Sequence, residues 1–291
     1  MKEKITGHTQ LLTLMGYPIR HTHSPLMHNE ALKVSGLDYA YLCFEVDNDN
    51  LEDAINSMKA LKVRGGNVTM PNKIEVIKYL DKLSEEAKMC GAVNTIVNSG
   101  GILTGHITDG IGYLRAIQDL GADIKGQKIT LVGAGGVGKT MQVSLARAGV
   151  AELSVFNVKD KFWQRAEDTV EMINQQTECK AALYDLADLD KLKDEIHSSY
   201  LVANATGVGM KPLEGKTYIP DKSFFREGMY VTDVIYSPKE TAFLKLAKQA
   251  GCITMNGLPM MLFQGAESFK LWTGMDMPID HMKKFLEKNI K

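Results

Sequence analysis

Apolar residues recur along the chain in two rhythms, one typical of buried strands and one typical of helices. They run almost continuously over residues 11–15 and 128–132, which predicts two buried strands. Leu51 and Ile55 begin a helical repeat that predicts a helix over residues 51–61. Strand and helix patterns alternate in this way through most of the sequence, which favours a sheet covered by helices.

The first part of the chain contains a predicted helix over residues 25–34, with Ser24 as its N-cap and Pro25 at its first position. The strands predicted around this helix cover residues 39–46 and 67–70, and a hairpin joins residues 94–97 to 101–107.

The alternation is most regular after a polar, glycine-bearing connection at residues 121–127. Short β-rich runs and helical segments follow one another there, and we predict strands at residues 128–132, 153–156, 181–184, 200–203, 230–235 and 252–255. This pattern predicts a parallel, doubly wound α/β domain. Two helices, over residues 260–272 and 280–288, end the chain and are expected to fold back on its first part.

Composition and charge narrow the class of protein. The 291 residues are 44% hydrophobic and 24% charged with a net charge of −1, so nucleic acid is not an expected partner. We find no apolar run near the length of a membrane span and no signal peptide, and we therefore expect a cytoplasmic protein without a membrane partner. The four cysteines form no C-x-x-C pair and are expected to be reduced.

Residues 133–140 read G-A-G-G-V-G-K-T, which satisfies two phosphate-binding patterns at once. As G-x-G-x-x-G the segment predicts a dinucleotide loop, and Asp160, just beyond the strand at 153–156, is the acid expected at the adenosine ribose. As G-x-x-x-x-G-K-T it predicts a P-loop nucleotide hydrolase or kinase, in which Asp233 would help to hold Mg²⁺. We favour the dinucleotide interpretation because nothing else in the sequence supports the P-loop one.

Polar residues with useful chemistry follow several predicted strands. Lys73 stands just after the strand that Pro71 ends, and Asp109 lies between a predicted strand and a predicted helix. Asn94 and Gln264 add amides near other strand and helix ends. Such a gathering of polar groups is typical of a substrate cleft between two domains.

Three histidines, at positions 21, 23 and 28, form a loose cluster near the N-terminus. The spacing of the first two is compatible with metal binding, but no third ligand follows at a suitable spacing. We therefore interpret these histidines as structural or exposed and predict no metal site.

Taken in order, these motifs resemble the shikimate dehydrogenases, most closely the quinate/shikimate dehydrogenase branch. The resemblance runs nearly from end to end. Its segments are residues 21–25, 27–29, 67–73, 91–95 and 108–110, the glycine loop, residues 204–206 and 209–210, Tyr236, Gly257, Gln264 and residues 271–274. It implies a substrate-binding α/β domain (residues 1–108, with helices of 258–291 packing back on it), a Rossmann-type NAD(P)-binding domain (residues 109–257) and a cleft between them.

The resemblance also implies an activity and a catalytic pair. The activity is reversible NAD(P)-dependent interconversion of 3-dehydroshikimate and shikimate, and of 3-dehydroquinate and quinate, as in the pathway to aromatic amino acids. Hydride leaves ring C3 only as the C3 hydroxyl loses its proton, so a base must stand within hydrogen-bonding reach. By resemblance Lys73 is that group, and Asp109 orients the lysine and the substrate hydroxyls.

Further site residues follow from the same resemblance. Substrate binding is implied for Thr22, Ser24, Tyr41, Thr69, Lys73, Asn94, Asp109, Tyr236 and Gln264. Cofactor binding is implied for Gly133, Ala134, Gly135, Gly136, Val137, Gly138, Asn157, Lys159, Asp160, Thr206, Val234 and Gly257. The chain departs from the family pattern at Ile107, where the family usually has Asn, and at Gly207, where close relatives have Lys or Ser.

The segment after the strand at 153–156 bears on the choice of cofactor. NADP-specific members often have an arginine where this chain has Val158, and Asp160 introduces a carboxylate that repels a 2′-phosphate. Lys159 partly offsets that repulsion. We expect NAD to be preferred and NADP to be tolerated at most.

Two alternatives to this enzyme stay open. One is the P-loop hydrolase or kinase, and the other is a non-catalytic sensor that binds a dinucleotide and a metabolite on the same fold. The resemblance leaves the oligomeric state as monomer or homodimer.

Overall fold

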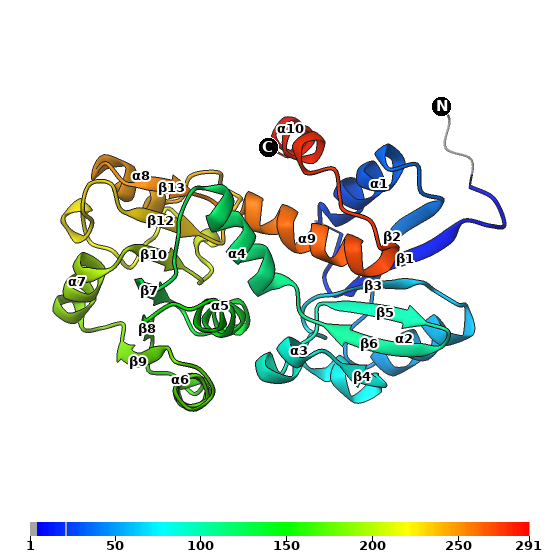
Figure 1. The fold of residues 1–291 in the computed structure, drawn as a ribbon, viewed down its shortest axis with the longest axis horizontal. Coiled ribbons are helices and arrows are strands. Elements are labelled where there is room, and N and C mark those ends of the chain that lie inside the picture. Colours follow the sequence, from blue (N-terminus) through cyan, green and yellow to red (C-terminus); the bar gives the residue numbers. More distant parts are fainter. Residues whose placement is uncertain (1–4, 21, 291) are drawn as a thin grey trace. The chain divides into compact units, whose positions relative to one another are not determined.

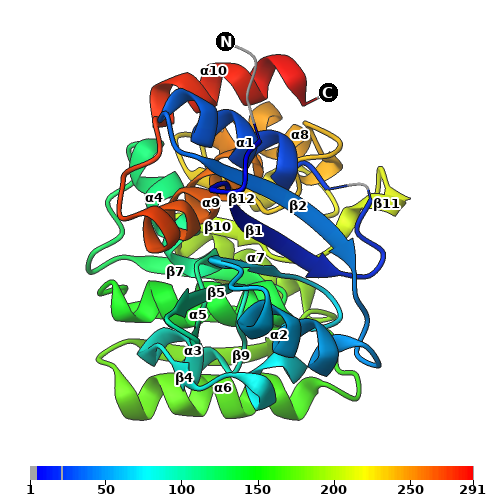
Figure 2. The same ribbon diagram turned by 90° about the vertical axis from the view of Figure 1, so that its right-hand side faces the viewer.

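The computed structural model describes residues 5–20 and 22–290 and divides into two compact units. Unit 1 comprises residues 1–108 and 262–291, and unit 2 comprises residues 109–261. Figure 1 draws the elements of both units in chain order, and Figure 2 gives a second view.

Unit 1 is built on a mixed sheet of six strands in the order β2-β1-β3-β5-β6-β4. Strands β1, β2 and β3 are parallel, whereas β5 is antiparallel to both β3 and β6. The elements are β1 (Gln10–Gly16), α1 (Ser24–Val34), β2 (Tyr39–Glu45), α2 (Leu51–Ala60), β3 (Gly65–Val68), η1 (Glu75–Tyr79), β4 (Lys82–Leu83), α3 (Glu85–Cys90), β5 (Thr95–Ser99), β6 (Ile102–His106), most of α9 (Leu258–Thr273) and α10 (Ile279–Asn289).

Unit 2 is built on a parallel sheet of six strands in the order β13-β12-β10-β7-β8-β9. This is the strand order of a Rossmann-type domain, with β7 as its first strand. The elements are α4 (Asp109–Asp119), β7 (Lys128–Val132), α5 (Gly136–Arg147), β8 (Glu152–Asn157), α6 (Trp163–Gln176), β9 (Lys180–Asp185), α7 (Leu189–Ser198), β10 (Leu201–Asn204), β11 (Val208–Glu214), η2 (Lys222–Phe224), β12 (Tyr230–Asp233), α8 (Ala242–Gln249), β13 (Ile253–Met255) and the start of α9.

The start of α1 differs from its prediction. Ser24 is the first residue of the helix rather than its N-cap, and His23 occupies the cap position without a side-chain hydrogen bond to the helix. The His23 carbonyl accepts the N–H of Met27, so the helical turn closes one residue earlier than predicted. The Ser24 hydroxyl is therefore available for contacts other than capping.

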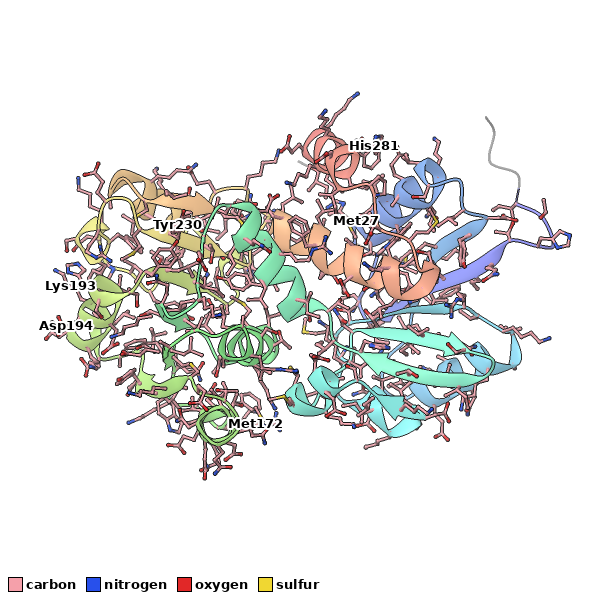
Figure 3. All side chains as sticks on the ribbon, viewed as in Figure 1. Met27, Met172, Lys193, Asp194, Tyr230 and His281 are labelled. Atoms are coloured by element: carbon pink, nitrogen blue, oxygen red, sulfur yellow. The ribbon has the colours of Figure 1, made fainter. Side chains whose placement is uncertain are left out.

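The C-terminal helices complete the core of unit 1. Trp272 of α9 is fully buried, and its indole N–H donates to the Ile96 carbonyl at 3.0 Å. Gly65 makes room for that ring, since a Cβ there would lie 2.6 Å from it. Helix α10 runs beside α1 in both views, and its His281, labelled in Figure 3, lies 2.8 Å from the Glu30 carboxylate.

An apolar cluster fills one side of the unit 2 sheet. It joins side chains of β7, β8, β10 and β12 to those of α7 and α8, among them Leu192, Ile196 and Phe243. An apolar core against a parallel sheet explains why these strands are rich in apolar residues in the sequence.

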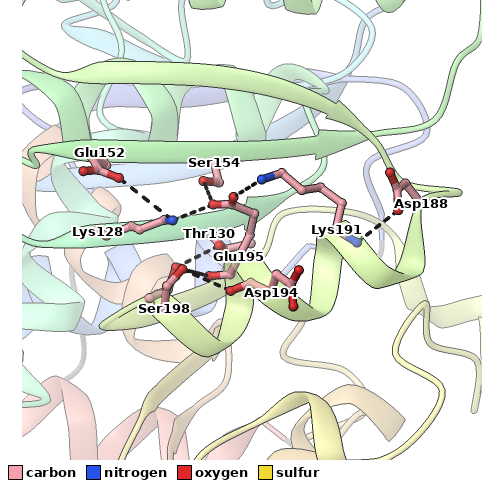
Figure 4. A network of polar contacts seen from close by, with 10 residues as sticks. Lys128, Thr130, Glu152, Ser154, Asp188, Lys191, Asp194, Glu195 and Ser198 are labelled. Atoms are coloured by element: carbon pink, nitrogen blue, oxygen red, sulfur yellow. Dashed lines mark hydrogen bonds and ion pairs between the residues drawn. The ribbon is translucent and has the colours of Figure 1, made fainter.

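An ion cluster around the buried Glu195 carboxylate lies where the unit 2 strands begin (Figure 4). The Glu195 carboxylate of α7 lies 2.7 Å from the Lys128 ammonium and 2.6 Å from that of Lys191, and it also accepts from the Ser154 hydroxyl. The cluster therefore ties α7 to the first residues of β7 and to β8.

Among the helices of residues 5–20 and 22–290, none has both the length and the apolar character needed to cross a membrane.

Candidate active site

Hydrogen bonds join several expected substrate-binding residues of unit 1. The Thr22 hydroxyl donates to the Ser24 hydroxyl at 3.2 Å, and Ser24 in turn hydrogen-bonds the Tyr41 side chain. Tyr41 is fully buried, and its hydroxyl donates to Asn67 Oδ1 at 2.7 Å. Burial raises the pKa of Tyr41 well above its ordinary value, so this phenol stays a neutral donor.

Two asparagines extend the chain of contacts with fixed amide orientations. Asn67 Nδ2 donates to the Asn94 carbonyl at 3.0 Å, which leaves its Oδ1 for Tyr41. Asn94 Oδ1 accepts the backbone N–H of Thr108 at 2.9 Å, so its Nδ2 faces the Thr108 hydroxyl at 3.0 Å. Because a backbone N–H is always a donor, it settles which way the Asn94 amide points.

Gln264 lies at the far end of this array. The Thr108 hydroxyl is 3.5 Å from Gln264 Oε1, and Ser268, one turn later on α9, donates to the Gln264 carbonyl at 3.1 Å. Ser268 also lies 2.7 Å from the Thr95 hydroxyl. Five expected residues (Thr22, Ser24, Tyr41, Asn94 and Gln264) thus belong to one hydrogen-bonded array in unit 1.

The sequence interpretation missed four members of this array, Asn67, Thr95, Thr108 and Ser268. Their signal in the sequence is a polar residue within or beside an apolar run, and each is buried. A buried polar side chain is tolerated in a native structure when neighbouring groups hydrogen-bond to it. Here those neighbours include residues expected to bind the substrate.

Lys73 stands in a turn between β3 and η1 that backbone hydrogen bonds hold on both sides. The Asn72 N–H donates to the Thr69 carbonyl at 2.9 Å, and the Val93 N–H donates to the Lys73 carbonyl at 2.8 Å. The buried Asn72 side chain donates to the Val46 carbonyl at 2.8 Å. These hydrogen bonds fix the backbone of Lys73 and link it directly to Val93, the residue before Asn94.

The histidines fall into different environments. His28 is fully buried and stacks on the Tyr41 ring with centroids 4.5 Å apart, and burial lowers its pKa to about 3. His23 is half-buried, and His21 lies outside the described residues. Over residues 5–20 and 22–290, no three His, Cys, Asp or Glu side chains are grouped as a metal site.

Asp109 belongs to unit 2, where it is the buried first residue of α4. The next residue, Gly110, packs against α5 so closely that a Cβ there would lie 1.9 Å from the Ser144 hydroxyl. Tyr236 is also in unit 2, in the segment after β12, and burial raises its pKa. The structure thus assigns Lys73 to one unit and Asp109 and Tyr236 to the other.

The glycine loop has the geometry of a phosphate cradle. Gly133 has a φ of 105°, and a Cβ on Gly138 would lie 2.1 Å from the Gly133 carbonyl, so neither position tolerates a larger residue. Gly135 is the N-cap of α5, and a Cβ on Gly135 or Gly136 would meet nothing within 4 Å. The first-turn N–H groups of α5 thus border open space on this side, which suits an anion such as a pyrophosphate.

The end of β8 supports the other side of this loop. Asn157 Oδ1 accepts the Ala134 N–H at 3.0 Å, and the Phe156 carbonyl accepts the Gly133 N–H at 2.7 Å. Beyond Asn157, Lys159 and Asp160 are exposed. Asp160 Oδ1 accepts the Phe162 N–H at 2.8 Å, and the Lys159 ammonium lies 3.8 Å from the Asp185 carboxylate.

Comparison with known proteins places this geometry in a family. Residues 14–96 match the family model described as the shikimate dehydrogenase substrate binding domain, and residues 257–287 match the shikimate 5′-dehydrogenase C-terminal domain. A shikimate dehydrogenase (NADP(+)) of Listeria monocytogenes is 52% identical over 284 residues, which is 98% of each chain. The chain belongs to the shikimate dehydrogenase family.

Two solved structures show how far the similarity extends. The shikimate 5-dehydrogenase of Listeria monocytogenes in complex with shikimate and NAD is 51% identical with a TM-score of 0.96, covering 98% of this chain and 99% of that chain. The quinate dehydrogenase of Corynebacterium glutamicum in complex with NAD is 30% identical with a TM-score of 0.85, covering 96% and 99%. The predicted α/β class, with a substrate-binding domain and a Rossmann-type dinucleotide domain, is confirmed.

The comparisons give no support to the P-loop alternative, and the local geometry explains why that interpretation fails. The Thr140 hydroxyl, which a P-loop would offer to Mg²⁺, is buried and donates to the Val137 carbonyl at 2.7 Å. Asp233 accepts hydrogen bonds from three neutral groups of its own unit. The G-K-T string is therefore the first turn of a helix that follows a dinucleotide loop.

Proposed function

We propose that this protein catalyses the reversible NAD(P)-dependent interconversion of 3-dehydroshikimate and shikimate, and also that of 3-dehydroquinate and quinate. The observation that carries the proposal is the full-length likeness to a shikimate dehydrogenase in complex with shikimate and NAD. The hydroxyl and amide array of unit 1 and the glycine cradle of unit 2 supply the two kinds of binding group that such a reaction needs.

We assign substrate binding to the array in unit 1. The Thr22 and Ser24 hydroxyls suit the ring carboxylate, because hydroxyl groups donate well to an anion. Thr69, Asn94 and Gln264 suit the ring hydroxyls, and Tyr41 fixes the array through Asn67. Tyr236 completes the set from unit 2. On this assignment, substrate recognition belongs mainly to residues 1–108 and the helices of 258–291.

We assign proton transfer to Lys73 and orientation to Asp109. Lys73 takes the proton of the C3 hydroxyl during oxidation and returns it during reduction, which requires hydrogen-bonding reach to that oxygen. Asp109 accepts a hydrogen bond from the neighbouring substrate hydroxyl and so orients the substrate. NAD(P), when bound, accepts or supplies the hydride.

The cofactor side is assigned to residues 109–257. The glycine loop, with the open α5 N-terminus, holds the pyrophosphate, while Asn157, Lys159 and Asp160 border the adenosine ribose, and Thr206, Val234 and Gly257 line the rest. We propose a preference for NAD because Val158 offers no cation to a 2′-phosphate and the Lys159 charge lies beside Asp185. The assignment of the loop depends on its glycine geometry, whereas the cofactor preference depends on the exposed charges of Lys159 and Asp160.

One kinetic panel tests the activity and the cofactor preference together. Shikimate and quinate are each assayed with NAD⁺ and with NADP⁺, and the expected result is turnover of both acids with a higher kcat/KM for NAD⁺. A higher kcat/KM with NADP⁺ would overturn the preference alone. Absence of turnover with both acids, in a protein that still binds NAD⁺, would favour a sensor instead.

The role of Lys73 has its own test. Lys73→Ala is expected to lower kcat by about a hundredfold or more, because general acid–base catalysis contributes roughly that factor. The Kd for NAD⁺ should stay unchanged, since Lys73 belongs to unit 1. Lys78→Ala, which removes an exposed ammonium paired with Glu75 in the same segment, is the matched control and should leave kcat as in wild type.

A further inference from the structure

The Asp233 carboxylate joins the end of β10 to the segment between β12 and α8 through three hydrogen bonds. Its Oδ1 accepts Asn204 Nδ2 at 3.1 Å and the Ile235 N–H at 3.0 Å, and its Oδ2 accepts the Thr241 hydroxyl at 2.6 Å. These donors come from the end of β10, from the residues directly after β12 and from the N-cap of α8. Only 3% of Asp233 is exposed, so its hydrogen bonds are shielded from water.

Asn204 links Asp233 to the segment after β10 by hydrogen bonds. Asn204 Oδ1 accepts both the N–H of Thr206 at 3.1 Å and its hydroxyl at 2.8 Å, and the backbone donor fixes the amide orientation. Its Nδ2 must then face Asp233. Thr206 in turn packs against the glycine loop, since a Cβ on Gly133 would lie 2.6 Å from the Thr206 methyl.

Thr241 and Ile235 link Asp233 to the segment after β12 by hydrogen bonds. Thr241 Oγ1 caps α8 by accepting the Leu244 N–H, while its proton goes to Asp233. The Ile235 carbonyl accepts the Gly257 N–H at 2.9 Å, and a Cβ on Gly257 would lie 2.0 Å from the Val234 carbonyl. Residues 234–241 and Gly257 are therefore held as one piece.

The strand order shows which half of a dinucleotide this piece would meet. In a Rossmann-type domain the pyrophosphate lies at the loop after the first strand, and the adenosine ribose lies at the end of the second. These strands are β7 and β8 here, and β10, β12 and β13 lie on the other side of β7. The Asp233 contacts thus lie on the nicotinamide side of the sheet.

We propose that Asp233 is a positioning residue for the nicotinamide half of the dinucleotide, acting through Asn204 and Thr241 on the segments 204–209 and 234–241. This inference rests on the proposed function, because it presumes that NAD(P) binds at the glycine loop. In this role Asp233 acts through its hydrogen-bond partners rather than by a contact of its own with the cofactor. Its effect is to fix the backbone of Thr206, Val234 and Gly257, which are expected to contact the cofactor.

An acceptor with two oxygens suits this position better than an amide. Three donors converge on the side chain, and a carboxylate is the acidic group that accepts all of them without offering a proton of its own. An asparagine would present an NH₂ group to Asn204 or Thr241 and would force one of these partners to turn. The identity of Asp233 is thus explained by the arrangement of the strand ends, without any metal.

The test compares the binding of ADP, which lacks the nicotinamide half, with the binding of NAD⁺. Thr241→Val removes the hydroxyl donor, and Thr241→Ser restores it in a side chain of nearly the same reach. ADP reports on the adenosine and pyrophosphate half, whereas NAD⁺ reports on both halves, and isothermal titration calorimetry measures Kd for each. Thr232→Val is the matched control, because it removes another buried hydroxyl, 2.8 Å from Tyr113, on the strand that carries Asp233.

The expected result for Thr241→Val is a Kd for NAD⁺ raised about tenfold, the usual effect of losing one hydrogen bond to a charged group, with the Kd for ADP within about twofold of wild type. Thr241→Ser should recover wild-type NAD⁺ affinity and kcat, and Thr232→Val should change neither Kd. Equal losses for ADP and NAD⁺, or no loss for either, would overturn the inference.

A second variant covers the case in which Thr241→Val does not fold. Asp233→Asn keeps one acceptor oxygen and is expected to weaken NAD⁺ more than ADP in the same way. Failure of the proposed function looks different from failure of this inference. In the first case the wild-type protein itself binds no NAD⁺, and in the second the wild type binds NAD⁺ and the variants bind it equally well.

Discussion

Glu195 of α7 and Asp233 of β12 are two carboxylates of unit 2 that are buried to a similar degree but ionise very differently. Glu195 lies at the end of the unit 2 sheet where the strands begin, here called the amino edge. Asp233 lies at the opposite end, where the strands finish, here called the carboxyl edge. The exposed fractions are 6% and 3%. The pKa of Glu195 is lowered to about 2, whereas that of Asp233 is raised to about 6.

The partners account for the difference. Burial opposes ionisation of Glu195, but hydrogen bonds from Lys128, Lys191 and Ser154 outweigh it and lower the pKa. Burial likewise raises the pKa of Asp233, and its donors, Thr241, Ile235 and Asn204, are all neutral and offset only part of that effect. Glu195 has two cationic partners, whereas the donors to Asp233 are all neutral, so the pKa values of the two carboxylates shift in opposite directions.

The comparison shows that the two edges serve different needs. At the amino edge, an ion cluster fastens α7 to the sheet (Figure 4). At the carboxyl edge, where we propose that a dinucleotide binds, neutral donors hold the segments in place. Lysines fixed around Asp233 would compete with the α5 N-terminus for the pyrophosphate.

The largest effect is expected from breaking the amino-edge cluster. Glu195→Gln leaves the Lys128 and Lys191 ammonium groups without their shared carboxylate, and we expect the free energy of unfolding to fall by about 2–3 kcal/mol. Both lysines are partly exposed, which limits the loss. Urea denaturation at pH 7 measures it, and KM values for NAD⁺ and shikimate should stay at wild-type levels.

Glu152→Gln is the matched control for that change. Glu152 lies 3.9 Å from the same Lys128 ammonium but is largely exposed, so its loss should cost less than about 0.5 kcal/mol. An equal cost for the two variants would mean that the buried cluster has no special role, and the contrast between the edges would disappear.

The next prediction concerns the pH dependence that distinguishes the two carboxylates. A pKa raised in the folded state gives a stabilisation that is present at pH 4 and is lost as the pH rises through about 6, which is the Asp233 case. A lowered pKa gives the reverse, so the Glu195 contribution is full above pH 5 and is lost as the pH falls toward 2.

Asp233→Asn isolates this effect. Its free energy of unfolding, relative to wild type, should rise by roughly 2 kcal/mol between pH 4 and pH 7, because the variant does not ionise at a buried position. Thermal unfolding at the two pH values measures the difference. A difference that stays constant with pH would show that Asp233 does not titrate in this window.

The sequence predicts regular elements well where burial is continuous. Strand β7 (Lys128–Val132) agrees with its prediction because four of its five residues are buried and three of these are apolar, as expected of a central parallel strand. The short elements α3 (Glu85–Cys90) and α8 (Ala242–Gln249) were not predicted. Their capping residues, Ser84 and Thr241, accept first-turn N–H groups and are the signal that marks these helices.

Partners from distant segments are what the sequence could not show. Asp233 at the end of a strand fits a Mg²⁺ ligand of a P-loop as well as a hydrogen-bonded carboxylate, and only its neighbours on β10 and α8 decide between them. Glu195 sits in a helix rich in charged residues, so the sequence suggests a solvated face. In both cases the packing of strands and helices around the carboxylate sets its chemistry.

A third prediction extends the comparison to an exposed carboxylate of the carboxyl edge. Asp160→Ser should raise kcat/KM for NADP⁺ by about tenfold, because a carboxylate repels the 2′-phosphate while serine donates to it. The Ser hydroxyl still accepts the Phe162 N–H, so the turn should persist. Folding stability should change by less than about 0.5 kcal/mol, unlike that of Glu195→Gln, because Asp160 is exposed.

The smallest effect is expected from Asp185, which lies 3.8 Å from the Lys159 ammonium at the end of β9. Asp185→Asn should release that cation toward a 2′-phosphate and raise kcat/KM for NADP⁺ by about threefold, since exposed ion pairs are worth less than about 1 kcal/mol. The same substitution in a Lys159→Met background should then have no effect. A gain that survives without the lysine would mean that Asp185 acts on the phosphate by itself, and the carboxyl edge would then select its cofactor through the sum of its carboxylates rather than through the Lys159 pair.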